Sequence, residues 1–307
     1  RIAGLFFKLG NVVKQSNRDP DGQALTLADR DSTVDWNGPL VILTSRMSAS
    51  ASEIVAGTLK DYSRAVIVGG DHTFGKGSVQ SVQELPPGLG AVKTTVGWFF
   101  TPGGFSTQWR GVDGDVVLPS ALANDEFGEK TLDYSLNPQQ IKPFKSEEAK
   151  ADWVEVTKSD IDQLKTRASA RVAKNPEFQK IVTETKKAKA RGKLIKLAES
   201  FKESKERKDE TDQKKAWTKE DRLAEYLKRA DLQEAVNVAA DLFATQNKVP
   251  LNKVVIPPPP APAPTKVAAA VAPVKKTGEG EAVVQKNVIE NSSGAIKRDE
   301  KESSQTN

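Results

Sequence analysis

Three serines and one lysine are the residues of this chain that could carry out nucleophilic chemistry. Ser48, Ser50 and Ser52 alternate with alanines just before a segment of helical spacing, and Lys76 lies in a glycine-rich turn. The chain has no cysteine and a single histidine, His72. A serine hydroxyl is a weak nucleophile until a base takes its proton. The base for such a serine is therefore expected to be a group other than histidine.

A lysine can be that base when its surroundings favour the neutral amine. In water at pH 7 only about one lysine in a few thousand is neutral, because the reference pKa is about 10.4. Burial in an apolar site disfavours the ammonium form. Gly75 and Gly77 allow close backbone approach around Lys76, and Phe74 can contribute an apolar wall. The turn therefore suits a lysine base.

The start of a helix offers a second catalytic feature. The first N–H groups of a helix have no partner within it, and their partial positive charge stabilises an oxyanion. The N–H of Ala51, directly after Ser50, would be one such donor. A purely structural interpretation competes, because serine is favoured at helix N-caps without any catalysis. Taken alone, the serine cluster favours capping over catalysis.

Two other mechanisms fit the sequence less well. Residues Gly70–Lys76 satisfy the first seven positions of a nucleotide-binding P-loop, but Gly77 stands where serine or threonine should bind magnesium. The following Val79–Val82 also has the pattern of a strand rather than a helix. A Ser-His-Asp triad would need His72, and no G-x-S-x-G elbow is present.

Composition excludes several classes of protein. The 307 residues carry a net charge of +5 with a mean hydropathy of −0.51, and the absence of cysteine excludes disulfides and thiolate metal sites. No basic cluster has interleaved aromatic residues, so nucleic acid is not an expected partner. No apolar run approaches the length of a transmembrane segment. We predict neither a metal nor a cofactor.

The segments around the serine cluster predict a βαβ unit. Pro39–Thr44 and Arg64–Gly69 are short apolar runs typical of strands buried on both faces, and Ser50–Ser63 between them has one apolar helical face. Their order predicts a right-handed crossover. Other segments predict a helix over Arg1–Gln15, a surface loop over Ser16–Val34, and strands over Val79–Leu85 and Val92–Phe100.

Changes in composition divide the chain into three parts. Residues 1–122 predict an α/β core, a βαβ unit with a mixed sheet, and residues 123–250 predict a mainly α-helical C-terminal domain of charged, amphipathic helices. Residues 251–307 are rich in proline, alanine and lysine. This tail cannot bury enough apolar area to offset its chain entropy, so we expect it to be disordered.

The serine and lysine segments together resemble a known family. Ser48–Ile54 and Thr73–Gln80 are similar to the tail-specific, or C-terminal processing, proteases, which are S41 serine peptidases. Gly103–Val112 and Asp115–Pro119 resemble the closing segment of the same protease core. The resemblance is strong over residues 38–119 and includes both candidate catalytic segments.

The helical part carries a weaker resemblance to the same proteases. Glu177–Phe178 and Glu234–Val238 resemble the C-terminal domain of the long periplasmic members, which implies a location in the bacterial periplasm or on the inner membrane facing the periplasm. The family cleaves peptide bonds through an acyl-enzyme, without a cofactor. The implied substrates are proteins with apolar, poorly structured C-termini, and an adaptor protein is a further implied partner.

The resemblance also assigns roles to single residues. The Gly69–Thr73 loop is one residue longer than is usual in the family, so Ser52 stays as the alternative nucleophile. The five assigned residues are Ser50 as the nucleophile, Lys76 as the general base, Gln80 as the residue that orients the lysine, Ala51 as an oxyanion donor through its N–H, and Asp61 as a supporting carboxylate.

Two features of the family are not recognised in this sequence. They are the glycine-rich strand-to-helix segment that helps to build the oxyanion hole, and the PDZ domain that captures substrate C-termini. We therefore expect the chain to be the C-terminal part of a longer protease, with little or no activity alone. The alternative is a non-catalytic scaffold or adaptor on a protease-like core, in which basic helices and the proline-rich tail bind partners.

Overall fold

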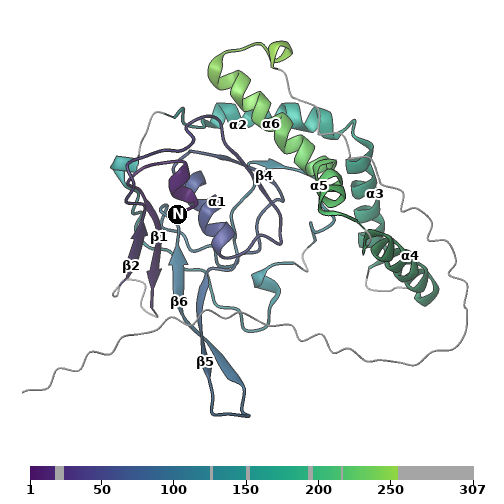
Figure 1. Ribbon diagram of the computed structural model, residues 1–307, viewed down its shortest axis with the longest axis horizontal. Helices are drawn as coiled ribbons and strands as arrows, with labels where there is room; N and C mark the ends of the chain where they lie inside the picture. The colour runs from purple at the N-terminus through teal and green to yellow at the C-terminus, as the bar shows by residue number, and fades with distance from the viewer. Residues whose placement is uncertain (18–23, 125–126, 150–152, 193–195, 216, 255–307) are drawn as a thin grey trace, which may run out of the picture. The chain divides into compact units, whose positions relative to one another are not determined.

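The computed structural model describes residues 1–254 except 18–23, 125–126, 150–152, 193–195 and 216 (Figure 1). A short 3-10 turn at Leu251–Lys253 is its last helical element. The predicted disordered tail, residues 251–307, lies outside the described residues from residue 255 onward.

A parallel sheet forms the centre of the fold. Its strands are β3 (Val41–Thr44), β4 (Val66–Gly69) and β7 (Val116–Val117), in the order β3-β4-β7. Helix α1 (Ala51–Asp61) connects β3 to β4, which pair in parallel. This arrangement confirms the predicted βαβ unit. All four residues of β4 are buried, as expected for a strand covered on both faces.

A second, antiparallel sheet has the order β2-β1-β6-β5. Strands β5 (Ser78–Glu84) and β6 (Ala91–Phe100) are the two predicted strands, and they form a hairpin whose turn contains Gly88 and Gly90 at positive φ. The core is thus α/β as predicted, with its parallel and antiparallel strands in two separate sheets (Figure 1).

The predicted N-terminal helix is wrong. Only Ala3–Leu5 form a 3-10 turn, and the chain continues as strand β1 (Asn11–Ser16), which pairs with β6. Gly10 explains the break, because a Cβ there would lie 2.6 Å from the ring of the buried Phe7. The β-branched valines that follow Gly10 suit a strand.

The predicted surface loop after this segment is also wrong in part. Residues Leu25–Ala28 form strand β2, which pairs with β1 in an antiparallel register, Asn11 opposite Ala28. Every residue of β2 is exposed, so neither face of the strand is buried. The sequence therefore lacks the sustained alternation of apolar and polar residues that predicts a strand. Residues 18–23 of the same predicted loop lie outside the described residues.

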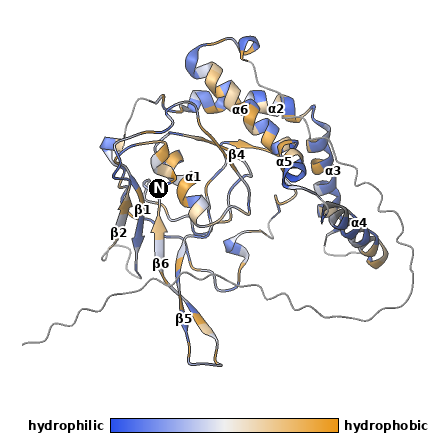
Figure 2. Ribbon diagram, viewed as in Figure 1, coloured by the Kyte–Doolittle hydropathy of each residue, from blue (hydrophilic) through white to orange (hydrophobic). Residues whose placement is uncertain are grey.

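The C-terminal part is helical, as predicted. Thr157 and Thr218 each begin a helix with a capping box, and Asn175 accepts from two N–H groups at the start of another. Figure 2 shows α4 as mostly hydrophilic. The helices are α2 (Lys158–Val172), α3 (Pro176–Arg191), α4 (Leu197–Lys215), α5 (Lys219–Leu227) and α6 (Ala230–Asn247).

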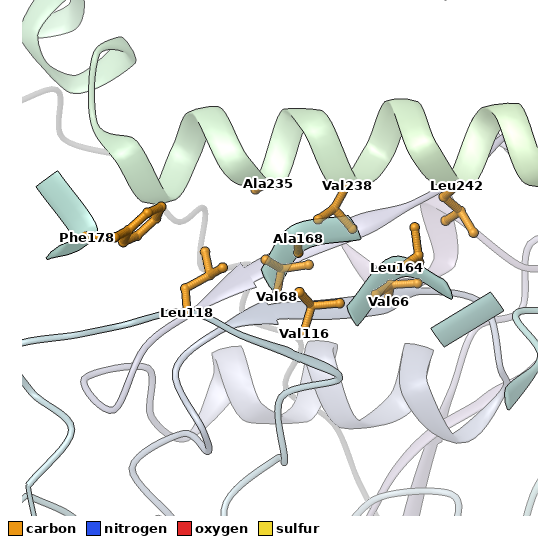
Figure 3. Packing of buried hydrophobic residues seen from close by; sticks show 10 residues of the cluster. All are labelled: Val66, Val68, Val116, Leu118, Leu164, Ala168, Phe178, Ala235, Val238 and Leu242. Carbon is orange, nitrogen blue, oxygen red and sulfur yellow. The ribbon is translucent and has the colours of Figure 1, made fainter. Parts of the chain in front are cut away.

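One apolar core joins the helices to the parallel sheet (Figure 3). Leu164 of α2 and Leu242 of α6 are fully buried against Val66 of β4. Residues on both sides of the predicted boundary at 122/123 therefore share this core, while the division into three domains stays a prediction. The buried members are Val66, Val68, Val116, Leu118, Leu164, Ala168, Phe178, Ala235, Val238 and Leu242.

Ion pairs add to the contact between α2 and α6. Arg171 of α2 donates through Nε to Glu234 at 2.9 Å, and its Nη2 lies 2.9 Å from Asp241. Both carboxylates are buried, and Asp241 also lies 3.8 Å from Arg167, so removing Arg171 would leave Glu234 as the less compensated charge. In the described ranges, no helix is long and apolar enough to cross a membrane.

Candidate active site

Ser50 occupies a strained position between β3 and α1. It is the N-cap of α1, with φ 55° and ψ −111°. A positive φ is uncommon for residues other than glycine, and such conformations cluster at functional sites. The spacing of Ser50 and Glu53 is that of a capping box, and the Glu53 carboxylate accepts the Ser50 N–H. The Ser50 side chain itself makes no capping hydrogen bond within the described residues, so the purely structural role is not fulfilled by its hydroxyl.

The carboxylate of Glu53 is the centre of the site. It is fully buried, and its Oε2 accepts from the N–H groups of Ser50 at 2.8 Å and Lys76 at 2.9 Å. Its Oε1 accepts from the Thr73 hydroxyl at 2.5 Å and the Gly75 N–H at 2.6 Å. Burial raises the pKa of the Glu53 carboxyl, and these four hydrogen bonds oppose that rise.

This shared carboxylate brings the serine and lysine segments together. The backbone nitrogens of Ser50 and Lys76 are hydrogen-bonded to the same oxygen. The sum of the two hydrogen-bond lengths is therefore the upper limit of the distance between these nitrogens. A further bond joins the segments, from the Phe74 N–H to the Ser48 carbonyl at 2.9 Å. The two motifs, 26 positions apart in the sequence numbering, therefore form one site.

The ammonium of Lys76 contacts Ser78 rather than the candidate nucleophile. Its Nζ donates to the Ser78 carbonyl at 3.0 Å and to the Ser78 hydroxyl at 3.2 Å. Within the described part of the chain, no hydrogen bond joins Lys76 Nζ to Ser50 Oγ. The direct contact expected of a Ser-Lys pair is therefore not formed in this structure.

The lysine turn is braced from its other side by the segment around Gln108. The buried Gln108 side chain accepts from the Gly77 N–H at 2.9 Å, and the Trp109 N–H donates to the Gly75 carbonyl at 2.8 Å. Gly75 has φ +90°, and a Cβ there would lie 2.9 Å from the Trp109 backbone. Glycine is required at this position because both the conformation and the space exclude a side chain.

Family comparisons agree with this geometry. Residues 1–118 match the model of peptidase family S41, and residues 122–231 match the C-terminal domain of tail specific protease. Residues 1–118 are therefore similar to peptidase family S41. The S41 match contains the whole serine–lysine site, and the second match contains α2 to α5.

Two bacterial relatives are a tail-specific protease and a carboxy-terminal-processing protease. A tail-specific protease of Haemophilus influenzae is 32% identical over 223 residues, which cover 69% of this chain and 31% of the relative. A carboxy-terminal-processing protease of Bartonella bacilliformis is 45% identical over 141 residues, 46% of this chain and 31% of the relative. The chain thus spans about a third of the length of these curated relatives.

A solved structure and a plant relative complete the comparison. The photosystem II D1 C-terminal processing protease is 34% identical, with a TM-score of 0.35, and the match covers 40% of this chain and 34% of that chain. This score is too low to compare the two folds. A chloroplast carboxyl-terminal-processing peptidase of Arabidopsis thaliana is 39% identical over 138 residues, 45% of this chain and 27% of the relative.

Asp61, the supporting carboxylate of the S41 resemblance, lies at the opposite end of α1 from Ser50. A helix rises about 1.5 Å per residue, so the two backbones are about 16 Å apart. The Asp61 carboxylate accepts from the Gly103 N–H at 2.7 Å. This contact fits a supporting role, which stays a prediction, and the distance excludes direct contact with Ser50.

The remaining candidates in the S41 site have different surroundings. Gln80 is exposed on β5, and among the described residues it forms no hydrogen bond with Lys76. Ser52 is exposed, and its hydroxyl donates to the Ala49 carbonyl at 2.7 Å. The N–H of Ala51 is the first of α1 and has no partner within the helix. The roles of all three stay predictions.

The histidine and the P-loop alternatives have no support in this geometry. His72 Nδ1 lies 2.6 Å from the Thr73 carbonyl, and its Nε2 lies 3.9 Å from Asp71. The loop with Lys76 leads into strand β5, whereas a P-loop leads into a helix.

Three residues of the site were given no role by the sequence. They are Glu53, Thr73 and Ser78. The spacing from Ser50 to Glu53 is that of a capping box, so the local half of the Glu53 contacts was readable. The other half depends on a loop 20 residues away that only the fold brings close.

Proposed function

We propose that the full-length gene product containing this chain is a serine endopeptidase of the C-terminal processing type. In this proposal Ser50 is the nucleophile and Lys76 the general base. The observation that carries it is the Glu53 carboxylate, whose Oε2 accepts the N–H groups of both residues. A serine that only caps a helix needs no lysine segment on the same carboxylate.

The first half of the reaction forms an acyl-enzyme. The neutral Lys76 amine takes the Ser50 hydroxyl proton while Oγ attacks the carbonyl carbon of the scissile peptide. The Ala51 N–H donates to the oxyanion of the tetrahedral intermediate. The Lys76 ammonium then gives its proton to the leaving nitrogen, the C–N bond breaks, and an ester to Ser50 remains.

The second half repeats these transfers with water. The Lys76 amine takes a proton from water, whose oxygen attacks the ester carbon. Collapse of the second intermediate breaks the bond to Ser50 Oγ, which recovers the proton from Lys76. One water is consumed, and the products are a new carboxylate and a new amine.

Ser50 Oγ and Lys76 Nζ must come within hydrogen-bond reach of each other for this chemistry. The Lys76 N–H is bound by Glu53, and the N–H of the next residue, Gly77, is bound by Gln108. The movement is therefore a rotation of side-chain torsions with the backbone fixed. Catalytic hydrogen bonds are often long or absent without substrate, so the observed contact with Ser78 is compatible with a resting enzyme.

Substrate, partner and location follow from the family resemblance. We propose protein substrates with apolar, poorly structured C-termini, an adaptor protein as a further partner, and a periplasmic location. The low activity expected of the 307-residue chain alone also stays a prediction. Assaying that chain beside the full-length gene product tests it directly.

The decisive experiment measures hydrolysis of a fluorogenic peptide with an apolar C-terminus by the full-length gene product. Ser50→Ala and Lys76→Ala should each lower kcat by about 10³-fold or more, as for other nucleophiles and their bases. Lys93→Ala, at an exposed position of β6, is the matched lysine control for charge loss. Thermal unfolding should show that the inactive variants still fold.

Three outcomes would contradict the proposal. Full activity of Lys76→Ala would exclude the lysine base. Loss of activity in Ser52→Ala but not in Ser50→Ala would move the nucleophile to Ser52. Hydrolysis by neither the wild type nor any variant, with the protein folded, would favour the non-catalytic scaffold.

A further inference from the structure

We propose that Ser78 is a positioning residue for Lys76, a role that no family assignment gives it. Its carbonyl and hydroxyl hold the two N–H groups of the neutral amine, so that the remaining lone pair is free for the Ser50 proton. This inference rests on the proposed Ser-Lys function.

Two contacts from one residue define the orientation of the amine. Lys76 Nζ lies 3.0 Å from the Ser78 carbonyl oxygen and 3.2 Å from the Ser78 hydroxyl oxygen. A neutral amine has two N–H donors and one lone pair. When both donors are used, rotation about the last side-chain bond is fixed and the lone pair has one direction left.

The position of Ser78 makes it a rigid partner. It is the first residue of β5, it pairs with Trp98 of β6, and only 5% of its surface is exposed. The preceding Gly77 is held by Gln108, where a Cβ on Gly77 would lie 2.5 Å from the Gln108 backbone nitrogen. A buried hydroxyl on a strand that is fixed by its neighbours loses little conformational entropy when it binds the Lys76 amine.

The strand geometry also explains why Ser78 reaches the lysine and Gln80 does not in this structure. The register of β5 against β6 shifts between Val79 and Gln80, and such an irregularity interrupts the regular alternation of faces along a strand. Ser78 is buried beside the turn, whereas Gln80 is exposed one step further along β5. Ser78 therefore performs in this structure the orienting contact that the family resemblance assigns to Gln80.

A pair of isosteric variants isolates the hydroxyl. Ser78→Thr keeps it, and Ser78→Val replaces it with a methyl group of similar volume, while both residues favour strands. Ser78→Ala removes it without adding volume. Ser81→Ala, on the same strand, is the matched control. Steady-state kinetics of the full-length gene product on the fluorogenic peptide give kcat and KM for each.

We expect Ser78→Ala and Ser78→Val to lower kcat by about tenfold with KM nearly unchanged, because orientation of the base matters in the transition state. Ser78→Thr should stay close to the wild type, and Ser81→Ala should match it. Equal kcat values for the Thr and Val variants, or wild-type kcat for Ser78→Ala, would overturn the inference.

The controls separate this inference from the proposed function. If Ser50→Ala and Lys76→Ala are inactive while all Ser78 variants turn over normally, only the role of Ser78 is overturned. If Ser50→Ala still hydrolyses the peptide, the proposed function fails and the inference fails with it.

Discussion

Helix α1 carries two carboxylates that could support a serine nucleophile, and their surroundings differ. Glu53, in the first turn, is fully buried and accepts four hydrogen bonds through both of its oxygens. Asp61, in the last turn, accepts the Gly103 N–H through one oxygen. The family resemblance draws attention to Asp61, whereas the geometry gives Glu53 the direct link between serine and lysine.

The difference shows how one helix can position a site at one end and be anchored at the other. Glu53 determines where Ser50 and Lys76 lie relative to each other. Asp61 fixes the loop around Gly103, where a Cβ would lie 2.8 Å from the Asp61 carboxylate. A side chain that uses both oxygens tolerates fewer replacements than one that uses a single oxygen.

Glu53→Gln should have the largest effect, because an amide cannot accept on both sides. If its NH₂ group replaces Oε2, the N–H groups of Ser50 and Lys76 lose their acceptor. If the NH₂ group replaces Oε1, the Gly75 N–H loses its acceptor. Leaving buried donors unpaired should lower the free energy of unfolding by about 2–3 kcal/mol and greatly reduce hydrolysis. Urea unfolding and peptide hydrolysis measure the two effects, and near-wild-type values in both would remove Glu53 from the centre of the site.

Asp61 should tolerate the corresponding change. Asp61→Asn keeps one oxygen for the Gly103 N–H, so its free energy of unfolding should stay near that of the wild type. Asp61→Ala removes the acceptor and should cost about 1–2 kcal/mol. The same unfolding assay compares the two variants. A large loss in Asp61→Asn would show that the charge, rather than the single hydrogen bond, is required.

A third carboxylate, Asp71, extends the comparison to a partly exposed position. The Arg46 guanidinium donates to it at 2.9 and 2.6 Å and lowers the pKa of Asp71 to about 2. Because the folded pKa lies below the unfolded value, this pair stabilises the protein at pH above about 4.

The stabilisation by this pair is lost as the pH falls toward about 2, and solvent screening of the partly exposed Asp71 carboxylate limits it to about 1 kcal/mol. Asp71→Asn should therefore flatten the dependence of unfolding free energy on pH between about 5 and 2. An unchanged slope in this variant would assign the acid sensitivity to other carboxylates.

The sequence predicted the parts of the fold that depend on local pattern. The apolar run before the serine cluster, the helix after it and the strand Val66–Gly69 formed as expected. Each of these segments has a hydrophobic pattern that matches the period of one type of secondary structure. The helix predicted over Arg1–Gln15 failed because Val13 pairs with Leu27 of β2, and Lys14 with Phe100 of the distant β6, which outweighed the helical spacing of the segment.

The site was predictable at the level of motifs but not of contacts. The resemblance selected Ser50 and Lys76, and the structure placed their backbones on one carboxylate. The contact of Lys76 with Ser78 depends on the lysine rotamer, which no sequence pattern determines. Glu53 could be connected to Ser50 from its spacing, but its bonds to Thr73 and Gly75 require the tertiary fold.

The most direct test of the central claim is a crystal structure of the full-length gene product with a peptide boronic acid that ends in an apolar residue. The account predicts boron bonded to Ser50 Oγ, a boronate oxygen on the Ala51 N–H, and Lys76 Nζ within hydrogen-bond reach of Ser50 Oγ. Boron on Ser52, or a Lys76 amine that stays out of reach of the modified serine, would contradict it.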